Sequence, residues 1–337
     1  MDVAFLGIDL AKNIFQLHGE DADGRAILQR RVRRDRLMIE VEALPPCTIA
    51  IEACTGAFYW QRQFEAAGHQ VRIIAPQYVK PFAQHQKNDR NDAAAICRAV
   101  QQPNMKFVPG KTVEQQDIQA LHRGRQRLVN HRTALVSQMR GLLLDRGVAF
   151  AQSITRARRE IGLLLEEGAP ELSDLFRSML HQLYACFSAL DRQIAWFDSE
   201  IEKIFRSNDT CRRLSKIRGV GPKTATAIVA AVGDGAEFTN GRHLAAWMGL
   251  VPRQHSSGNR QRLFGISKRG DRHLRTLLIH GARAVVRTST GRDDARSAWI
   301  RHLKARRGAA KTIVAVANKN ARVIFAMLKK GTEFRAA

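Results

Sequence analysis

The sequence of 337 residues has no long apolar run and only five cysteines. Its longest stretch of small and apolar residues, over positions 224–233, falls far short of the roughly 20 residues that a membrane-spanning helix needs. No basic segment stands at the start, as a secretory signal would require. The cysteines are scattered without a C-x-x-C pair, which argues against a disulfide scaffold and a cysteine zinc site. We therefore expect a cytoplasmic protein without a membrane partner.

Acidic residues are scarce in the last third of the chain. Lys and Arg outnumber Asp and Glu by 55 to 31 overall, a net charge of +24. Residues 206–337 hold 28 of the basic and 7 of the acidic residues, net +21, whereas residues 1–110 and 111–205 carry only +2 and +1. A field this one-sided attracts a polyanion, and nucleic acid is the usual one. The same three ranges are the domains that we predict.

Strands and helices alternate in the first 110 residues. The predicted strands are 3–10, 14–18, 26–32, 48–53 and 71–75, and the predicted helices are 35–43, 57–67 and 89–101. Short turns join the first three strands, which is typical of an antiparallel meander. The later strands follow helices, so we expect them to run parallel to the first strand. The pattern predicts an α/β domain.

Apolar residues recur at heptad spacing in the middle of the chain. One seam includes two arginines: Ile118, Leu121, Arg125, Leu128, Arg132, Leu135, Met139 and Leu142. A second seam has one stutter: Leu172, Phe176, Met179, Leu183, Phe187, Leu190, Ile194, Phe197, Ile201 and Ile204. Gly168 and Pro170 interrupt the pattern. It predicts two long helices, packed either as an antiparallel hairpin or as a seam between subunits.

The basic last third is predicted to be mainly helical. Gly219 and Gly221 flank a tight turn, and Pro222 stands where a new helix can begin. We expect further helices and one long polar loop beyond it: helices at 242–248, 272–287 and 309–330, and the loop at 249–265.

Four carboxylates are the first candidates for chemistry. Asp9 lies inside an otherwise apolar strand, and Glu52 is the only charge near the end of what should be the adjacent parallel strand. Buried acids need a partner or a metal. Asp89 and Asp92 share one face at a helix start, where the helix dipole alone would also favour them. Together the four suit Mg²⁺ or Mn²⁺, and two such ions can clamp the attacking and leaving oxygens of a phosphodiester.

The order of elements and the local motifs resemble a known family. GIDLAK on the first strand and IEA on the fourth resemble the ribonuclease H fold in its RuvC form. With KNDRNDA, the heptad middle, IRGVGPKTA and GLVPRQHSSGNRQRLFGISKRGDRHLRTLLIHGA, the whole chain resembles insertion-sequence transposases with an Asp-Glu-Asp-Asp site, the bridge-RNA-guided recombinases. Sugar kinases and actin-like ATPases share only the first strand, and their further Gly-rich phosphate loops are absent from this sequence.

The resemblance implies specific roles. Asp9, Glu52, Asp89 and Asp92 would be catalytic residues that hold Mg²⁺ or Mn²⁺, and Ser257 would be the nucleophile. Ser256 is the adjacent rival, and turn chemistry alone would make this segment only a flexible loop. Many relatives have a second glycine where Asn259 stands.

Nucleic-acid-binding residues are expected at two places. IRGVGPKTA resembles a helix-hairpin-helix, whose turn binds phosphate through backbone N–H groups, although a plain helix-helix turn would look the same. The expected contacts are Gly219, Gly221, Lys223, Arg253, Arg260, Arg262, Lys268, Arg269, Arg272 and Arg275. We expect the histidines at 122, 131, 255, 273, 280 and 302 at the surface or facing RNA, and Trp60, Trp196, Trp247 and Trp299 in cores.

The resulting prediction is an RNA-guided DNA recombinase of a mobile element. Its partners would be the element's DNA and target DNA, a structured guide RNA, and further copies of the same chain. Two alternatives stay open: a two-metal junction nuclease that forms no covalent link, and a non-catalytic nucleic-acid-binding protein.

Overall fold

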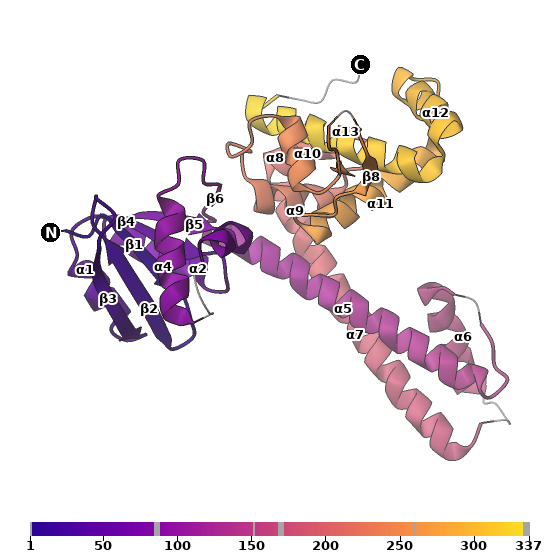
Figure 1. The fold of residues 1–337 in the computed structure, drawn as a ribbon. Helices are drawn as coiled ribbons and strands as arrows, with labels where there is room; N and C mark the ends of the chain where they lie inside the picture. Colours follow the sequence, from indigo (N-terminus) through magenta and orange to yellow (C-terminus); the bar gives the residue numbers. More distant parts are fainter. Residues whose placement is uncertain (1, 84–87, 151, 168–171, 259, 333–337) are drawn as a thin grey trace. The chain divides into compact units, whose positions relative to one another are not determined.

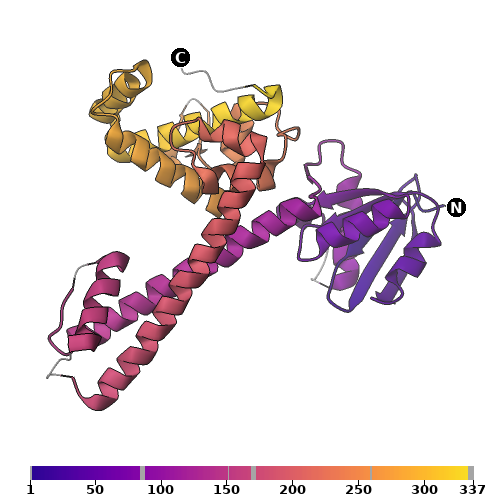
Figure 2. The ribbon, with the colours of Figure 1, turned by 180° about the vertical axis from the view of Figure 1, so that it is seen from behind.

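A computed structural model describes residues 2–83, 88–150, 152–167, 172–258 and 260–332. The chain forms two compact units, Met1–Thr112 and Val113–Ala337 (Figures 1 and 2). Asn259, Gly168 and Pro170 lie outside the described residues. No helix in the described ranges is both long enough and apolar enough to cross a membrane.

The first unit is built on one mixed sheet. Its strands are β1 (Phe5–Asp9), β2 (Ile14–Glu20), β3 (Ala26–Arg33), β4 (Thr48–Glu52), β5 (Gln70–Ile74) and β6 (Phe107–Val108), in the order β3-β2-β1-β4-β5-β6. Strands β1, β4 and β5 are parallel, while β2, β3 and β6 pair antiparallel with their neighbours. The predicted meander and the predicted parallel strands are confirmed. Strand β6 was not predicted, because two residues are too few to show an alternating pattern.

Helices cover both faces of this sheet. They are α1 (Leu37–Glu42), α2 (Ala57–Ala66), α3 (Pro76–Val79), η1 (Lys80–Phe82) and α4 (Asp89–Val100). Successive strand residues point to opposite faces, so Leu6 and Ile8 pack with α1 and α2, whereas Ala50 and Ile74 belong to the core under α4. Figure 1 shows α4 lying across one face of the sheet.

The second unit begins with a long helical hairpin. Its helices are α5 (Val113–Leu144), α6 (Ile154–Glu167) and α7 (Asp174–Ser207). The seam arginines bind α7 in antiparallel register, Arg125 to Asp198 at 2.6 Å and Arg132 to Asp191 at 2.8 Å. The structure therefore shows the hairpin, the first of the two predicted arrangements. Helix α6 was not predicted, and the predicted boundary at residue 205 falls inside this unit, near the end of α7.

The rest of the second unit is mainly helical, as predicted. Its elements are α8 (Asp209–Ser215), α9 (Pro222–Val232), α10 (Gly241–Trp247), β7 (Pro252–Gln254), β8 (Leu263–Ile266), α11 (Arg272–Thr288), α12 (Ala295–Arg307) and α13 (Ala309–Lys330). One core joins the helices, with side chains such as Ile228, Leu278 and Ile324 fully buried.

Two expectations about this unit were wrong. The predicted loop at 249–265 contains the antiparallel hairpin β7–β8, which the many polar residues of this segment hid. Trp196 on α7 is 56% exposed and Trp247 is 38% exposed, so they are not core residues, whereas Trp60 of the first unit is buried.

Candidate active site and nucleic-acid surfaces

Asp9 and Glu52 stand at the same edge of the sheet. They are the last residues of β1 and β4, which pair in parallel with Ile8 opposite Ile51. The next residue on each strand is the carboxylate, so the two acids are neighbours. Both side chains are half-buried, because each lies where its strand ends. The prediction that they are buried was therefore wrong.

The pleat of the sheet places both acids on one face. Asp9 lies two residues beyond Gly7, and Glu52 lies two residues beyond Ala50. Ala50 packs in the core beneath α4. Because residues two apart point to the same side of a strand, Asp9 and Glu52 face the α4 side.

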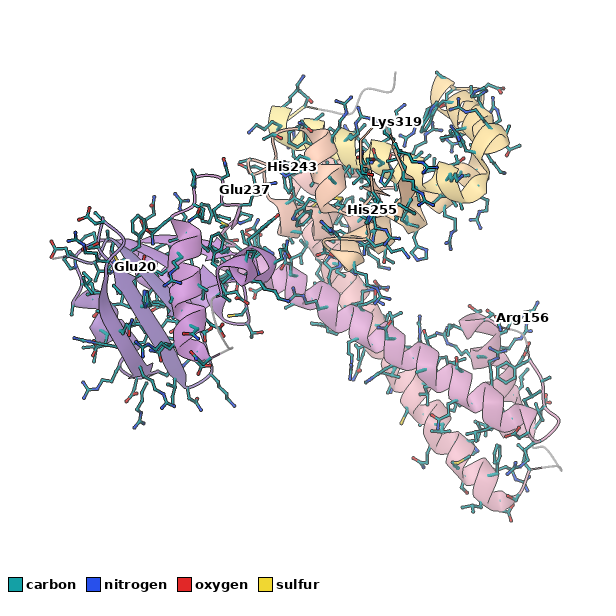
Figure 3. All side chains as sticks on the ribbon, viewed as in Figure 1. Glu20, Arg156, Glu237, His243, His255 and Lys319 are labelled. Atoms are coloured by element: carbon teal, nitrogen blue, oxygen red, sulfur yellow. The ribbon has the colours of Figure 1, made fainter. Side chains whose placement is uncertain are left out.

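Helix α4 runs in the opposite direction to β1 and brings its N-terminus to this edge. Near its C-terminal end, Cys97 Sγ donates to the Phe5 carbonyl oxygen at 3.4 Å, and Gln101 donates to Glu20, which pairs with Phe5. The first turn of α4 must therefore lie toward the Asp9 end of β1. Figure 3 labels Glu20, which pairs with Phe5 at the opposite end of β1 from Asp9.

Asp89 and Asp92 are on the first turn of α4. Asn88 caps the helix by accepting a hydrogen bond from the backbone N–H of Asn91 at 2.8 Å. Asp89 and Asp92 precede the buried Ala93 and Ile96 by four residues, which places them on the side of the helix that meets the sheet. Asp89 is exposed and Asp92 is half-buried. All four predicted carboxylates thus belong to one end of one α/β layer.

Cys54 is a neighbour of this site that the sequence analysis missed. It lies at the surface, two residues beyond Glu52. Partial desolvation raises the pKa of its thiol, and the negative charges of Glu52 and then Asp9 raise the pKa further. Cys54 thus lies within electrostatic range of both carboxylates.

Ser257 lies at the tip of the β7–β8 hairpin. Its carbonyl oxygen accepts from the Arg260 backbone N–H at 3.2 Å, and the pair forms an isolated bridge. His255 N–H donates to the Arg262 carbonyl oxygen at 3.0 Å, which closes the hairpin below the tip. Ser256 Oγ accepts from Gln254 at 2.8 Å. Ser256 and Ser257 are both exposed in an arginine-rich turn, so exposure does not separate the two hydroxyls.

Comparison with known proteins identifies the family. Residues 211–298 match the family model described as "Transposase IS116/IS110/IS902 family", and residues 6–146 match a DEDD-type IS110 model described as "Transposase". The chain is 45% identical, over 99% of its length, to a probable family 20 transposase of Pseudomonas aeruginosa, of which it covers 99%. It is also 45% identical, over 99% of its length, to the transposase for insertion sequence element IS1111A of Coxiella burnetii, of which it covers 92%.

The chain belongs to the IS110 family of transposases. A more distant relative, 24% identical over 99% of this chain and 98% of its own length, is a pilin gene-inverting protein of Moraxella bovis. The transposase is thus a member of a family of DNA-processing enzymes, and DNA is its partner. The α/β sheet with a helical C-terminal part is consistent with a RuvC-like transposase.

A DEDD-type transposase domain suggests the use of a divalent metal. Within the described ranges, no three His, Cys, Asp or Glu side chains already form a cluster that could hold a metal ion. The four carboxylates of this transposase nevertheless fit such an ion by their chemistry, since hard divalent cations prefer oxygen ligands. They come from one end of strands β1 and β4 and helix α4.

Acidic side chains of α7 already lie next to the helix-hairpin-helix-like turn of the transposase. Lys223 Nζ lies 2.8 Å from Asp198 of α7, and the N-terminal turn of α9 shares a small cavity with Asp198 and Glu202. Arg125 and Lys223 lower the pKa of the Asp198 carboxyl, against the effect of its partial burial. Lys223 is therefore tied to α7, and an incoming phosphate would have to compete with a carboxylate.

Gly219 serves close packing. Its φ is +88°, and a β-carbon built there would lie 2.9 Å from the Gly281 carbonyl oxygen of α11. At the same contact, a β-carbon on Gly281 would lie 1.8 Å from the Gly219 carbonyl oxygen. Gly221 is the N-cap of α9 with open space around it. The two glycines thus have different roles, which spacing alone could not separate.

The predicted basic contacts also divide into two groups. Arg275 donates to the carbonyl oxygens of Met248 and Arg269, at 3.1 and 2.9 Å, and so fastens two loops together. Lys268 adopts a left-handed backbone conformation, with φ at 56°, between these loops. The side chains that the structure exposes are Arg253, Arg260, Arg262, Lys268, Arg269 and Arg272.

His122 is not at the surface, as was expected, but buried between α5, α9 and α11. Its Nε2 lies 2.9 Å from Thr226 Oγ1, and its ring lies 5.4 Å from that of His273. Burial, and then the neighbouring His273, lower the pKa of His122 to about 4. Its place in the α5 heptad, next to Leu121, was the available signal.

Proposed function

We propose that this transposase cuts DNA strands and rejoins them through a covalent phosphoserine intermediate on Ser257. Asp9, Glu52, Asp89 and Asp92 would hold Mg²⁺ or Mn²⁺ at the edge of the first unit's sheet. The convergence of these four carboxylates at one end of β1, β4 and α4 is the observation that carries the proposal. The reaction takes place in the cytoplasm, where the element's DNA lies.

A bound divalent cation would neutralise charge on the phosphate oxygens and lower the barrier to attack. The four carboxylates would hold it next to the bound phosphate. Ser257 Oγ attacks the phosphorus, the Oγ–P bond forms, and one backbone P–O bond breaks to release a strand end as a hydroxyl. The exposed arginines of the hairpin, Arg253 and Arg260 among them, bind the phosphate oxygens.

The covalent step separates recombination from hydrolysis. A phosphoserine ester keeps the energy of the broken phosphodiester, so a second strand's hydroxyl can displace the serine without ATP. The Moraxella bovis relative supports rejoining, since inverting a gene requires that cut strands be resealed. A junction nuclease that uses water would leave its products unsealed, and a non-catalytic binder would not cut at all.

We further propose that a structured RNA from the element selects the DNA by base pairing. The basic second unit would hold the RNA and the DNA mainly by shape and backbone charge. An RNA that co-purifies with the full chain, and whose removal by ribonuclease stops strand exchange, supports this step. Strand exchange that survives complete RNA removal contradicts it.

The active site is proposed to combine two subunits. Ser257 and the carboxylates belong to different compact units, and the long helical hairpin offers a surface for assembly. Mixing Asp9→Ala protein with Ser257→Ala protein, under conditions that allow subunit exchange, is expected to restore part of the strand exchange that each lacks. If each active site is formed within one chain, mixing the two variants is expected to restore no strand exchange.

The decisive experiment is trapping of the protein–DNA adduct. Full-length protein is mixed with element-end DNA in Mg²⁺, denatured, and resolved by gel. The adduct is expected in the wild type and in Ser256→Ala, and its absence is expected in Ser257→Ala. An adduct that persists in Ser257→Ala overturns the nucleophile, and cleavage without any adduct favours the junction nuclease.

A further inference from the structure

A large cavity of the second unit is lined by none of the predicted basic contacts. It is a cleft of about 1690 Å³ between α10, α12, α13 and the base of the β7–β8 hairpin, and we call it the α13 cleft. Figure 1 shows β8 beside α13, and Figure 3 labels Lys319 of α13 in the same part of the unit as His255 of the hairpin.

The wall of the α13 cleft is positively charged. Five basic side chains line it, and all are exposed: Arg242, Arg307, Lys311, Lys319 and Arg322. The described lining includes no Asp or Glu. This charge is therefore not cancelled within the cleft, unlike that of Lys223, which Asp198 neutralises. The cleft is complementary to an anion with several charges.

The remainder of the lining is apolar and partly aromatic. Phe264 on β8 is 44% exposed, and Leu263 beside it is 64% exposed. Trp299 of α12 contributes a ring, with Lys319 Nζ 4.5 Å from its centroid. Apolar rings next to several cations suit a ligand with flat apolar faces and regularly spaced negative charges.

We propose that the α13 cleft binds a single-stranded segment of DNA or RNA, with its phosphates on the basic side chains and bases against Phe264 and Trp299. A duplex fits these features less well, because its bases are already stacked and paired and only its phosphates could reach the wall. An acidic peptide would use the cations but not the rings.

The position of the cleft connects it with the candidate nucleophile. Strand β8 forms part of its wall, and the same hairpin carries Ser257 at its tip. A strand held in the cleft is therefore attached to the element that presents the serine hydroxyl. The inference rests on the proposed function for its biological meaning, but binding can be measured without cleavage.

The test measures the affinity of full-length protein for fluorescent oligonucleotides of one length: oligo(dT), oligo(U), and a mixed-sequence duplex. Lys311→Gln/Arg322→Gln removes two charges from the cleft. The matched control is Lys329→Gln/Lys330→Gln, two exposed charges on α13 outside the lining. The cleft variant is expected to bind single strands about tenfold or more weakly, since each lost phosphate contact weakens salt-dependent binding, and the control is expected to stay within about twofold.

A second variant separates stacking from charge. Phe264→Ala is expected to weaken binding to oligo(dT) or oligo(U) on the order of tenfold, with duplex affinity unchanged. The better of the two single strands shows whether DNA or RNA occupies the cleft. Equal losses for duplex and single strand, no loss in either variant, or displacement of oligonucleotide by oligo(Glu) of equal charge would each overturn the inference.

The adduct experiment on Ser257 and the binding experiment on the cleft variants distinguish the two proposals. If the adduct experiment fails while the cleft variants lose affinity, the covalent mechanism falls and the cleft assignment stands. If the adduct forms on Ser257 while the cleft variants bind normally, the reverse holds.

Discussion

Gly7 of β1 lies directly against Ala93 of α4. A β-carbon built on Gly7 would stand 2.3 Å from the Ala93 carbonyl oxygen and 2.6 Å from the Cys97 backbone nitrogen. No side chain fits there, so α4 can sit on the sheet only because residue 7 has none. This close approach brings the first turn of α4, with Asp89 and Asp92, to the edge that holds Asp9 and Glu52.

Replacing Gly7 by Ala is therefore expected to disable the site by moving α4. The backbone of a helix cannot give way as a flexible side chain can, so we expect a loss of about 1–3 kcal/mol in the free energy of unfolding. Strand exchange should fall more than tenfold. Gly141→Ala in α5, where the added methyl meets open space, is the control and should be neutral or slightly stabilising. Normal exchange by Gly7→Ala would show that the position of α4 does not matter.

Substitution of Asp89 and Asp92 tests whether each residue is a metal ligand or an ordinary first-turn acid. Asp89→Asn and Asp92→Asn keep the size of each side chain and remove its charge, so the helix loses only about 0.3–1 kcal/mol of dipole stabilisation. If each is a ligand, adduct formation in Mg²⁺ should fall at least about a hundredfold while nucleic-acid affinity is kept. Near-normal adduct formation in one variant would show that the replaced residue is only a helix-start acid. Glu42→Gln, at the exposed end of α1, serves as the control of equal chemistry.

Arg269 and Arg272 are expected to behave differently from Arg275. The first two are exposed, so Arg269→Gln/Arg272→Gln should reduce the salt dependence of nucleic-acid binding by up to about two log units of slope, one per phosphate contact. Arg275→Gln should instead lower thermal stability, because it removes the hydrogen bonds to Met248 and Arg269. A salt slope that changes only in Arg275→Gln would reverse these assignments.

Because His122 is buried, we expect the free energy of unfolding to fall in mild acid. Its pKa in the folded protein is about 4, below the ordinary value of 6.5. Between these values the unfolded chain binds a proton that the folded chain does not, so the free energy of unfolding decreases as the pH falls from 6.5 toward 4. At pH 5 the loss is up to about 2 kcal/mol. Urea unfolding at pH 7 and pH 5 measures it.

His122→Asn should flatten this pH dependence, even though it also loses the contact with Thr226 at both pH values. His131→Asn, on the exposed side of the same helix, should leave the pH dependence as it is in the wild type. An unchanged difference between pH 7 and pH 5 in His122→Asn would mean that another group causes the acid sensitivity.

The sequence by itself determined the elements and the charge. Alternating apolar residues specified the strands, heptad spacing specified α5 and α7, and both are local consequences of side-chain period. The carboxylates Asp9 and Glu52 could be recognised because a charge in an otherwise apolar strand segment is costly to bury without a partner. The +21 of residues 206–337 needed only counting.

Only the tertiary structure decided which residues of similar type have which surroundings. Lys223 and Lys311 look alike in sequence, yet Asp198 neutralises the first and the second lines an acid-free cleft. Arg275 and Arg272 are three residues apart, yet only Arg275 fastens loops. The reason is that a side chain's electrostatic and packing environment comes from segments distant in the chain, here α7 for Lys223 and the 248–269 loops for Arg275, and no local pattern records them.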